Sequence, residues 1–451
     1  MSSNSEWARR DLKVLWHPCT QMKDHAEWPP IPIRRGEGVW LEDFEGNRYI
    51  DAISSWWVNL FGHGHPALNA AIRRQVETLE HVILAGFTHA PAIELAETLI
   101  EKAPPGLTRC FYADNGSSAI EIALKMSYHA WRNQGQPQKT RFITLENSYH
   151  GETLGALAVG DVPLYKETYA PLLMETYTVK SPDGFDRAAG VSLEAHAREV
   201  FKEMEEALAR HAHEVAAVII EPLVQCAGGM RMHHPVYLTL LREACTRHGV
   251  HLIADEIAVG FGRTGTLFAL EQAGVTPDFL CLSKGLTGGY LPLSVVLTTE
   301  SVYDVFYDDY ASGKAFLHSH SYTGNALACA VALESLRLFD RESILDQNLE
   351  KARWMREAIA PLEDHPHVAE IRQQGMILAI ELCQDKASRT PYPASERRGL
   401  KVHHEALRHG VLLRPLGNVV YFMPPYIITP SEIRQMADAA IAGISLATQE
   451  R

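Results

Sequence analysis

The sequence predicts an α/β fold in which a large domain, with a mainly parallel sheet flanked by helices, is joined to a smaller α+β domain. Between residues 66 and 334, short apolar runs typical of β-strands alternate with segments of helical periodicity. After residue 335 the chain becomes charged and helical, with only two further strand-like runs. We therefore expect a large domain over 66–334 and a small domain formed by the N-terminal segment 1–65 together with the C-terminal part 335–451.

The expected strands of the large domain are short and apolar throughout, as is typical of strands buried on both faces. They cover 108–113, 141–145, 215–220, 250–254, 278–283 and 293–298. In the small domain we expect strands at 38–42, 48–50, 376–382 and 419–425. This order favours a parallel sheet wrapped by helices.

A helix is expected directly after the first strand of the large domain, following Ser117. Apolar or small residues recur at 119, 122, 123, 126 and 130, the spacing of one helical face. Ser118 and Glu121 have the spacing of a capping box, in which the two side chains bond each other's backbone N–H groups.

Composition and charge exclude several classes of protein. The chain has 451 residues, 46% of them hydrophobic, and a formal net charge of -13. We expect no nucleic-acid or anionic-membrane partner, because no net positive field exists to attract one. No run approaches the roughly 20 apolar residues of a membrane span, and the first residues lack the apolar core of a signal peptide. The seven cysteines include no C-x-x-C pair, so we expect reduced thiols and a cytoplasmic protein.

Two further patterns are weak. Gly260, Gly262 and Gly265 match G-x-G-x-x-G after an expected strand, but no clear helix starts at the third glycine, so a dinucleotide site is disfavoured. The 22 histidines include several close pairs, but none has the spacing of a metalloenzyme motif, and we expect no metal.

Lys284 is the strongest candidate for chemistry. It follows the apolar run DFLCLS at the carboxyl end of an expected parallel strand, where open α/β sheets form their ligand crevice. Partial desolvation there lowers the pKa of an amine toward its nucleophilic neutral form. The alternative is a strand-end lysine that reaches solvent.

Asp255 ends the run VHLIA in the same way, 29 residues before Lys284, about the length of one strand, crossover and strand. Both side chains are expected at one crevice. A buried carboxylate needs a cationic partner, and a protonated pyridine nitrogen would serve. A helix cap or a structural ion pair is the alternative.

The turn Asp114-Asn115-Gly116-Ser117-Ser118 joins an expected strand to the expected helix. Free backbone N–H groups and the positive end of the helix dipole make such a turn a phosphate seat, although a plain strand-to-helix turn would look alike. Together with Lys284 and Asp255, the turn predicts a pyridoxal 5'-phosphate site.

At these residues the chain resembles the fold-type I, class III aminotransferases. The resemblance extends over nearly the whole length, through GEGVWLEDFEGNRYIDAISSWWVNLFGHGHP, ADNGSSAIEIALK, SYHGETLGALAVG, AAVIIEPLVQCAGG, LIADEIAVGFGRTG, LCLSKGLTGGYLPLS and SYTGNALACAVA. It implies a seven-stranded sheet in the large domain and a homodimer with shared active sites.

The resemblance also implies roles for single residues. Lys284 would bind the cofactor covalently and move a proton between the substrate Cα and the cofactor, and Asp255 would pair with the pyridine nitrogen. Gly116 and Ser117 would hold the phosphate, and Tyr149 would stack on the ring and touch the substrate.

In the same family, the segment that corresponds to His320 and Ser321 contacts the phosphate of the other subunit. Family members usually have Thr where Ser321 stands, and the hydroxyl needed for this role is retained. The backbone of Ser319 would contact substrate.

Within the class, Trp16-His-Pro-Cys-Thr20, the pair Trp56-Trp57 and the stretch from Arg414 to Tyr426 are similar to the branch that acts in biotin biosynthesis. This implies amino transfer to 8-amino-7-oxononanoate, with Trp56 and Trp57 lining the pocket and Arg414 holding the distant carboxylate. Adjacent tryptophans in an extended segment would point to opposite faces, so at least one of them needs a role other than core packing.

The amino donor stays open between S-adenosylmethionine and lysine, because Cys19 stands where the branch often has an aromatic residue. Three alternatives remain for the function. They are another class III transaminase acting on ω-amino acids or diamines, a pyridoxal-phosphate aminomutase, and a non-catalytic binding protein.

Overall fold

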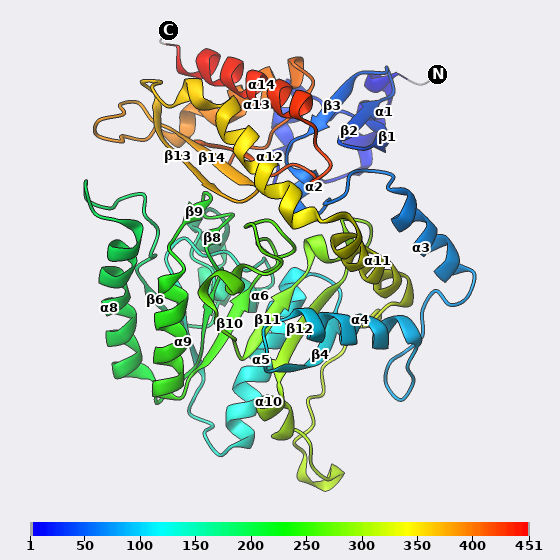
Figure 1. The fold of residues 1–451 in the computed structure, drawn as a ribbon, viewed down its shortest axis with the longest axis vertical. Coiled ribbons are helices and arrows are strands. Elements are labelled where there is room, and N and C mark those ends of the chain that lie inside the picture. The colour runs from blue at the N-terminus through cyan, green and yellow to red at the C-terminus, as the bar shows by residue number, and fades with distance from the viewer. Residues whose placement is uncertain (1–2, 450–451) are drawn as a thin grey trace.

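The computed structural model describes residues 3–449 and contains a central sheet with smaller sheets and helices packed at one end of it (Figure 1). Among these residues the central sheet has seven strands in the order β4-β12-β11-β10-β7-β5-β6. They are β4 (Leu107–Ala113), β5 (Arg141–Leu145), β6 (Tyr177–Val179), β7 (Val215–Ile220), β10 (His251–Asp255), β11 (Phe279–Leu282) and β12 (Ser294–Thr299). Only β12 runs antiparallel to its neighbours. The predicted mainly parallel, seven-stranded sheet is confirmed.

Alternate side chains of each central strand enter different cores, one on each face of the sheet. On β7, Val218 and Ile220 pack into the larger core with helices of one face, whereas Ala217 and Ile219 pack into the smaller core around α5 (Gly116–Asn133). The apolar runs in the sequence arise because both faces are covered.

The remaining α-helices of residues 3–449 are α1 (Asn4–Val14), α2 (Ser54–Trp57), α3 (Pro66–Val76), α4 (Ala90–Lys102), α6 (Leu154–Ala158), α7 (Pro163–Lys166), α8 (Leu193–His211), α9 (Val236–His248), α10 (Glu300–Asp304), α11 (Ala326–Glu342), α12 (Ile344–Ala358), α13 (Arg398–Arg408) and α14 (Pro430–Thr448). None of the helices within residues 3–449 has the length and apolar character needed to cross a membrane.

Both ends of the chain contribute to the smaller sheets. One contains β1 (Ile33–Glu37), β2 (Trp40–Asp43), β3 (Arg48–Asp51) and β15 (Val411–Leu412); a second contains β13 (Val368–Gln374), β14 (Ile377–Leu382) and β16 (Val419–Phe422); a two-stranded ribbon contains β8 (Val224–Gln225) and β9 (Arg231–Met232). Because β3 pairs with β15, the blue N-terminal strands lie beside the orange and red C-terminal elements in Figure 1. The domain boundaries at residues 65 and 334 stay a prediction, and residue 334 falls inside α11.

The start of α5 differs from the predicted capping box. The cap is Asn115, whose side chain accepts a hydrogen bond from the backbone N–H of Ser118 at 3.0 Å. Glu121 instead accepts hydrogen bonds from Thr153 Oγ1 at 2.6 Å and from the backbone of Gly155 at 2.7 Å. The helix begins three residues earlier than a Ser118 cap requires, which frees Glu121 to join α5 to the start of α6.

Candidate active site

Three predicted features meet at the carboxyl edge of the central sheet. Asp255 is the last residue of β10, and Lys284 comes two residues after the end of β11, which pairs with β10 in parallel. The start of α5 contacts the turn that follows Asp255, because a Cβ on Gly116 would lie 3.0 Å from Ile257 Cγ2. The lysine, the aspartate and the helix N-terminus therefore lie together at one edge of the sheet.

Lys284 directs its amine at an aromatic ring. The amine lies 4.7 Å from the centroid of the Trp57 ring, a cation–π distance. Burial lowers the pKa of the Lys284 amine, although the nearby Cys226, Asp255 and Glu221 oppose this shift. The environment thus favours a neutral, nucleophilic amine.

Asp255 is 4% exposed and is oriented by a buried histidine. Its Oδ2 lies 2.7 Å from Nδ1 of His150, and its Oδ1 accepts a hydrogen bond from the backbone of Ile257 at 3.1 Å. His150 Nε2 is also buried and has no hydrogen-bond partner among residues 3–449. An unpaired buried nitrogen is costly unless a further group meets it.

Glu221 is a site residue that the sequence analysis missed. It directly follows β7 and accepts hydrogen bonds from the backbone N–H groups of Tyr149 and Cys226, each at 3.0 Å. Burial, and then the charge of Asp255, raise the pKa of Glu221 well above its ordinary value. The rule that singled out Asp255, a carboxylate directly after an apolar strand, would have found it.

Ser117 and Gly151 are in close contact at the N-terminus of α5. Ser117 Oγ accepts a hydrogen bond from the backbone of Glu152 at 3.1 Å. Gly151 has φ +126°, and a Cβ there would lie 2.0 Å from Ser117 Oγ. Only glycine permits this approach, which brings the segment containing Tyr149 against the predicted phosphate seat.

Tyr149 has its hydroxyl turned toward Glu152. The hydroxyl donates a hydrogen bond to Glu152 Oε1 at 3.0 Å, and the ring lies 5.4 Å from that of Tyr165. Burial raises the pKa of Tyr149, and the carboxylate of Glu152 adds to the shift. The phenol is accordingly a neutral hydrogen-bonding group.

The two tryptophans are not in the extended segment that the sequence analysis assumed. Ser54, Ser55, Trp56 and Trp57 all have positive φ, between 47° and 73°, and form one left-handed turn, labelled α2 in Figure 1. Such a conformation costs L-residues roughly 1–2 kcal/mol each, so contacts outside the turn must hold it. In it Trp57 is 3% exposed and faces Lys284, whereas Trp56 is 38% exposed.

Arg414 joins Trp56 at the outer part of the site. Its guanidinium lies 4.7 Å from the centroid of the Trp56 ring, and its Nη2 donates to the backbone oxygen of Cys19 at 3.4 Å. Arg414 is exposed and forms no ion pair with any carboxylate of the described chain. Cys19 Sγ lies 3.8 Å from Glu152 Oε1, so Cys19 connects Arg414 to the side of the site that holds Tyr149.

The segment Ser319–Ser321 approaches the predicted phosphate turn only through His320. Ser319 and Ser321 are exposed, and neither forms a hydrogen bond with Lys284, Asp255 or Tyr149 within the region that the structure covers. His320 Nδ1 lies 3.7 Å from Asp114 Oδ2, next to the start of α5.

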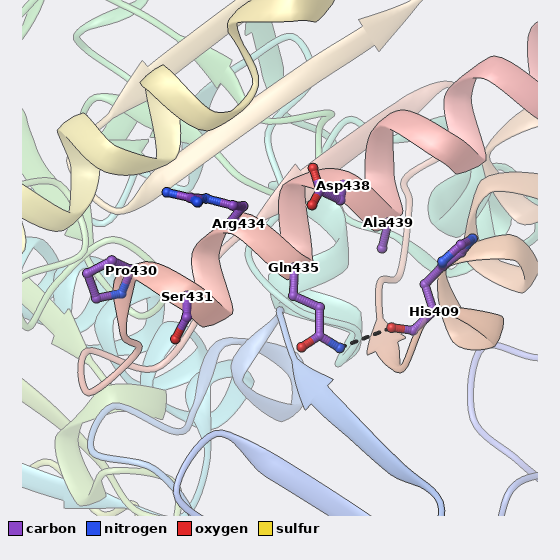
Figure 2. Close-up of a pocket in the computed structure, with 7 residues that line it drawn as sticks. All are labelled: His409, Pro430, Ser431, Arg434, Gln435, Asp438 and Ala439. Carbon is purple, nitrogen blue, oxygen red and sulfur yellow. Dashed lines mark hydrogen bonds between the residues drawn. The ribbon is translucent and has the colours of Figure 1, made fainter.

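A separate hollow of about 610 Å³ lies on the surface along α14 (Figure 2). It is lined by His409, Pro430, Ser431, Arg434, Gln435, Asp438 and Ala439. It contains none of the predicted site residues, and the only hydrogen bond drawn in Figure 2 joins Gln435 to the backbone of His409. Across residues 3–449, no group of three or more His, Cys, Asp or Glu side chains converges to hold a metal ion.

Comparison with known proteins agrees with this geometry. The sequence model of the family described as aminotransferase class-III matches residues 21–443. Two relatives, from Helicobacter pylori and Geobacter sulfurreducens, are named adenosylmethionine-8-amino-7-oxononanoate aminotransferase. They are 46% and 45% identical over 449 residues, covering 98% of this chain in each case and 98% and 97% of their own.

Solved structures give the same result. A crystal structure of adenosylmethionine-8-amino-7-oxononanoate aminotransferase from Methanocaldococcus jannaschii is similar with a TM-score of 0.93 and 37% identity, covering 98% of this chain and 99% of that one. An omega transaminase from Pseudomonas jessenii in complex with PMP is similar with a TM-score of 0.93 and 32% identity, covering 98% of each chain.

The chain belongs to the class III aminotransferases, and it is a pyridoxal-phosphate-dependent transaminase of fold type I. The residues present fit this cofactor. The partly buried Lys284 has no carboxylate in ion-pair contact among the described residues, and Asp255 lies at the same edge of the sheet with one oxygen already oriented by His150. The N-terminus of α5 offers backbone N–H groups that a phosphate needs.

Proposed function

We propose that this transaminase transfers an amino group from S-adenosylmethionine, or from lysine, to the ketone of 8-amino-7-oxononanoate, which gives 7,8-diaminononanoate for biotin biosynthesis. The names of relatives 36–46% identical over nearly the whole chain support this substrate. The observation that carries the proposal is Arg414, an exposed guanidinium stacked on Trp56 with no carboxylate partner in the described structure. A substrate with a carboxylate far from its reacting ketone needs such a cation at the outer end of the pocket.

The cofactor would be held at three points. Gly116, Ser117 and the N-terminus of α5 would bind its phosphate, Asp255 would bind its ring nitrogen, and Tyr149 would stack on the ring. The hydrogen bond of Asp255 with His150 supports this assignment, because it fixes the carboxylate in one orientation. When bound, the cofactor withdraws electrons from the Cα of the amine substrate.

Lys284 would move the proton during transfer. Its amine has a lowered pKa, so it would carry a proton from the Cα of the donor to the cofactor, and in the second half of the reaction a proton from the cofactor to the acceptor carbon that then bears the amino group. Trp57 lies against this amine and would shield that side of it from water once substrate is bound. Excluding water from the site prevents loss of the proton to solvent while it moves between the substrate and Lys284.

Charge balance in the crevice supports the same roles. Burial and the charge of Asp255 raise the pKa of Glu221, which shifts Glu221 toward its uncharged form and reduces the repulsion between the two carboxyl groups. Glu221 accepts hydrogen bonds from the backbone N–H groups of Tyr149 and Cys226, and these bonds fix the positions of both residues next to Asp255 and Lys284.

The substrate would lie between Lys284 and Arg414. Its alkyl chain would contact Trp56 and Trp57, and its carboxylate would bind Arg414 in the bidentate geometry of a guanidinium. Tyr149 would contact the reacting end, and the backbone of Ser319 from a second subunit would complete the pocket.

The exposed segment around Ser321 supports a homodimer with shared active sites as part of this proposal. Ile83, Phe87, Leu317 and Tyr322 on this side of the molecule are each more than half exposed. His320 and Ser321 of one subunit would then contact the phosphate in the other. Mixing an inactive Lys284→Ala chain with a weakly active Ser321→Ala chain should restore activity, because a mixed dimer has one site with both native residues. Independent sites would show only the weak activity of the Ser321→Ala chain.

The amino donor is tested by its product. Purified enzyme is incubated with 8-amino-7-oxononanoate and with either S-adenosylmethionine or lysine, and 7,8-diaminononanoate is measured by mass spectrometry. We expect product with one of the two donors. The effective donor then shows which amine the outer part of the site, with Cys19 and Glu152, accepts. Good turnover of β-alanine with pyruvate, and none of the oxononanoate, would assign the chain to the ω-amino acid transaminases instead. Turnover without any donor would indicate an aminomutase.

The cytoplasm is the proposed compartment. All seven cysteines are free thiols in the structure, which fits a reducing environment.

A further inference from the structure

The left-handed turn of Ser54–Trp57 cannot be explained by its own sequence. None of its four residues is glycine, yet all have positive φ. Consecutive left-handed residues other than glycine are strained, and such strain persists only when the surroundings determine it. Contacts with other parts of the chain must therefore hold the turn.

Asp51 contacts the turn more than any other side chain does. It is 0% exposed, at the end of β3. Its Oδ1 accepts a hydrogen bond from the backbone N–H of Ser55 at 2.8 Å, and its Oδ2 accepts one from Ser55 Oγ at 2.7 Å. Both oxygens of one carboxylate thus bind one residue in the middle of the turn.

A histidine fixes the carboxylate from the other side. His63 Nε2 lies 3.0 Å from Asp51 Oδ2, and Asn59 Nδ2 donates to His63 Nδ1 at 3.2 Å. Because Nδ1 is then the acceptor, Nε2 carries the hydrogen and donates it to Asp51. The hydrogen bonds thus run from Asn59 through His63 and Asp51 to Ser55 in the strained turn.

The ends of the turn are attached elsewhere. Ser54 Oγ donates to the backbone oxygen of Met423 at 2.8 Å, and Trp57 Nε1 donates to Tyr421 Oη at 3.0 Å. Arg263 Nη2 donates to the backbone oxygen of Trp57 at 3.3 Å. These contacts position the ends, whereas Asp51 holds the centre.

We propose that Asp51 is a positioning residue that holds the left-handed turn and so sets the distance between the two tryptophans and their side-chain partners, Trp57 with Lys284 and Trp56 with Arg414. Asp51 does not touch the substrate. It acts through the turn, and its effect is specificity for a substrate long enough to contact both tryptophans. The specificity part of the proposal rests on the proposed function.

The first test needs no substrate. The backbone N–H groups of Val58 and Asn59 both donate to the oxygen of Ser54 at 3.0 Å, so their exchange with deuterium reports whether the turn is formed. In holoenzyme carrying Asp51→Asn, whose amide presents a donor to His63 or Ser55, we expect this peptide to exchange at least about tenfold faster. Peptides of α5 should be unchanged. Unchanged exchange around Val58, or equal acceleration everywhere, would overturn the positioning role.

The second test measures specificity in the same holoenzyme. Asp51→Asn should raise KM for 8-amino-7-oxononanoate about tenfold or more, with a smaller change in kcat and with unchanged bound cofactor. The added change Ser55→Gly should restore part of the loss, because glycine adopts positive φ without the carboxylate. Equal losses in KM and kcat without rescue would contradict the proposal. If wild-type enzyme does not use this substrate, the proposed function fails, and the exchange result still decides the role of Asp51.

Discussion

Replacement of Gly151 by alanine is expected to weaken cofactor binding. Gly151 has φ +126°, a conformation that costs a residue with a Cβ about 1–3 kcal/mol. The new Cβ would lie 2.0 Å from Ser117 Oγ, so the hydroxyl must turn away from Glu152 N and from the phosphate. A hydrogen bond to a charged group contributes roughly 1.5–3 kcal/mol, which corresponds to about a 10- to 150-fold higher Kd for pyridoxal phosphate.

The assay is an equilibrium titration of apoenzyme with pyridoxal phosphate, followed by visible absorbance. Gly135→Ala is the matched control, because Gly135 also has positive φ, +79°, but a Cβ there meets nothing within 4 Å. The control should lose stability and keep its affinity for the cofactor. Equal Kd values for wild type, Gly151→Ala and Gly135→Ala would refute the argument that Ser117 and the α5 N-terminus hold the phosphate.

Three other changes test separate parts of the account. Lys284→Ala should lower kcat by at least about 100-fold, since it removes the proton carrier, and wild-type turnover would exclude that role. Arg414→Ala should raise KM for 8-amino-7-oxononanoate about 10- to 100-fold, whereas Arg434→Ala, in the hollow of Figure 2, should leave KM unchanged. Burial lowers the pKa of His251 to about 4, below its ordinary 6.5. Between these two pH values the folded protein therefore binds fewer protons than the unfolded chain, so the free energy of unfolding decreases as the pH falls. The whole shift corresponds to about 3 kcal/mol. The urea midpoint should therefore decrease from pH 7 to pH 5, and less so in His251→Asn; an equal decrease in both would contradict this cause.

Much of the fold could be predicted because its signals are local. Six strands of the central sheet are apolar runs bounded by turns, and the structure confirms them within two residues at each end. β6 was missed because Tyr177–Val179 is a three-residue edge strand with no apolar run of its own. β1 and β13 were missed because their residues are mostly not buried, which leaves no continuous apolar pattern.

The residues of the candidate site that stand directly after strands could be predicted from the sequence. Lys284, Asp255 and the turn at Gly116 were found because the carboxyl ends of parallel strands share one edge. The conformation of Trp56 and Trp57 was not predictable, because Asp51, Arg263 and Met423 hold the turn from distant parts of the chain. The partner of Asp255 was missed for the same reason, since His150 is 105 residues away.

The central claim is that Lys284, Asp255 and Arg414 form one transamination site for 8-amino-7-oxononanoate. A single-turnover experiment tests it most directly. Holoenzyme is first converted to its pyridoxamine phosphate form with an amino donor, and the excess donor is removed. The enzyme is then mixed with 8-amino-7-oxononanoate in a stopped-flow spectrometer. We expect return of the original visible absorbance together with one equivalent of 7,8-diaminononanoate per site, and a slower return in Arg414→Ala at the same substrate concentration. Absorbance that returns with pyruvate but not with 8-amino-7-oxononanoate would contradict it.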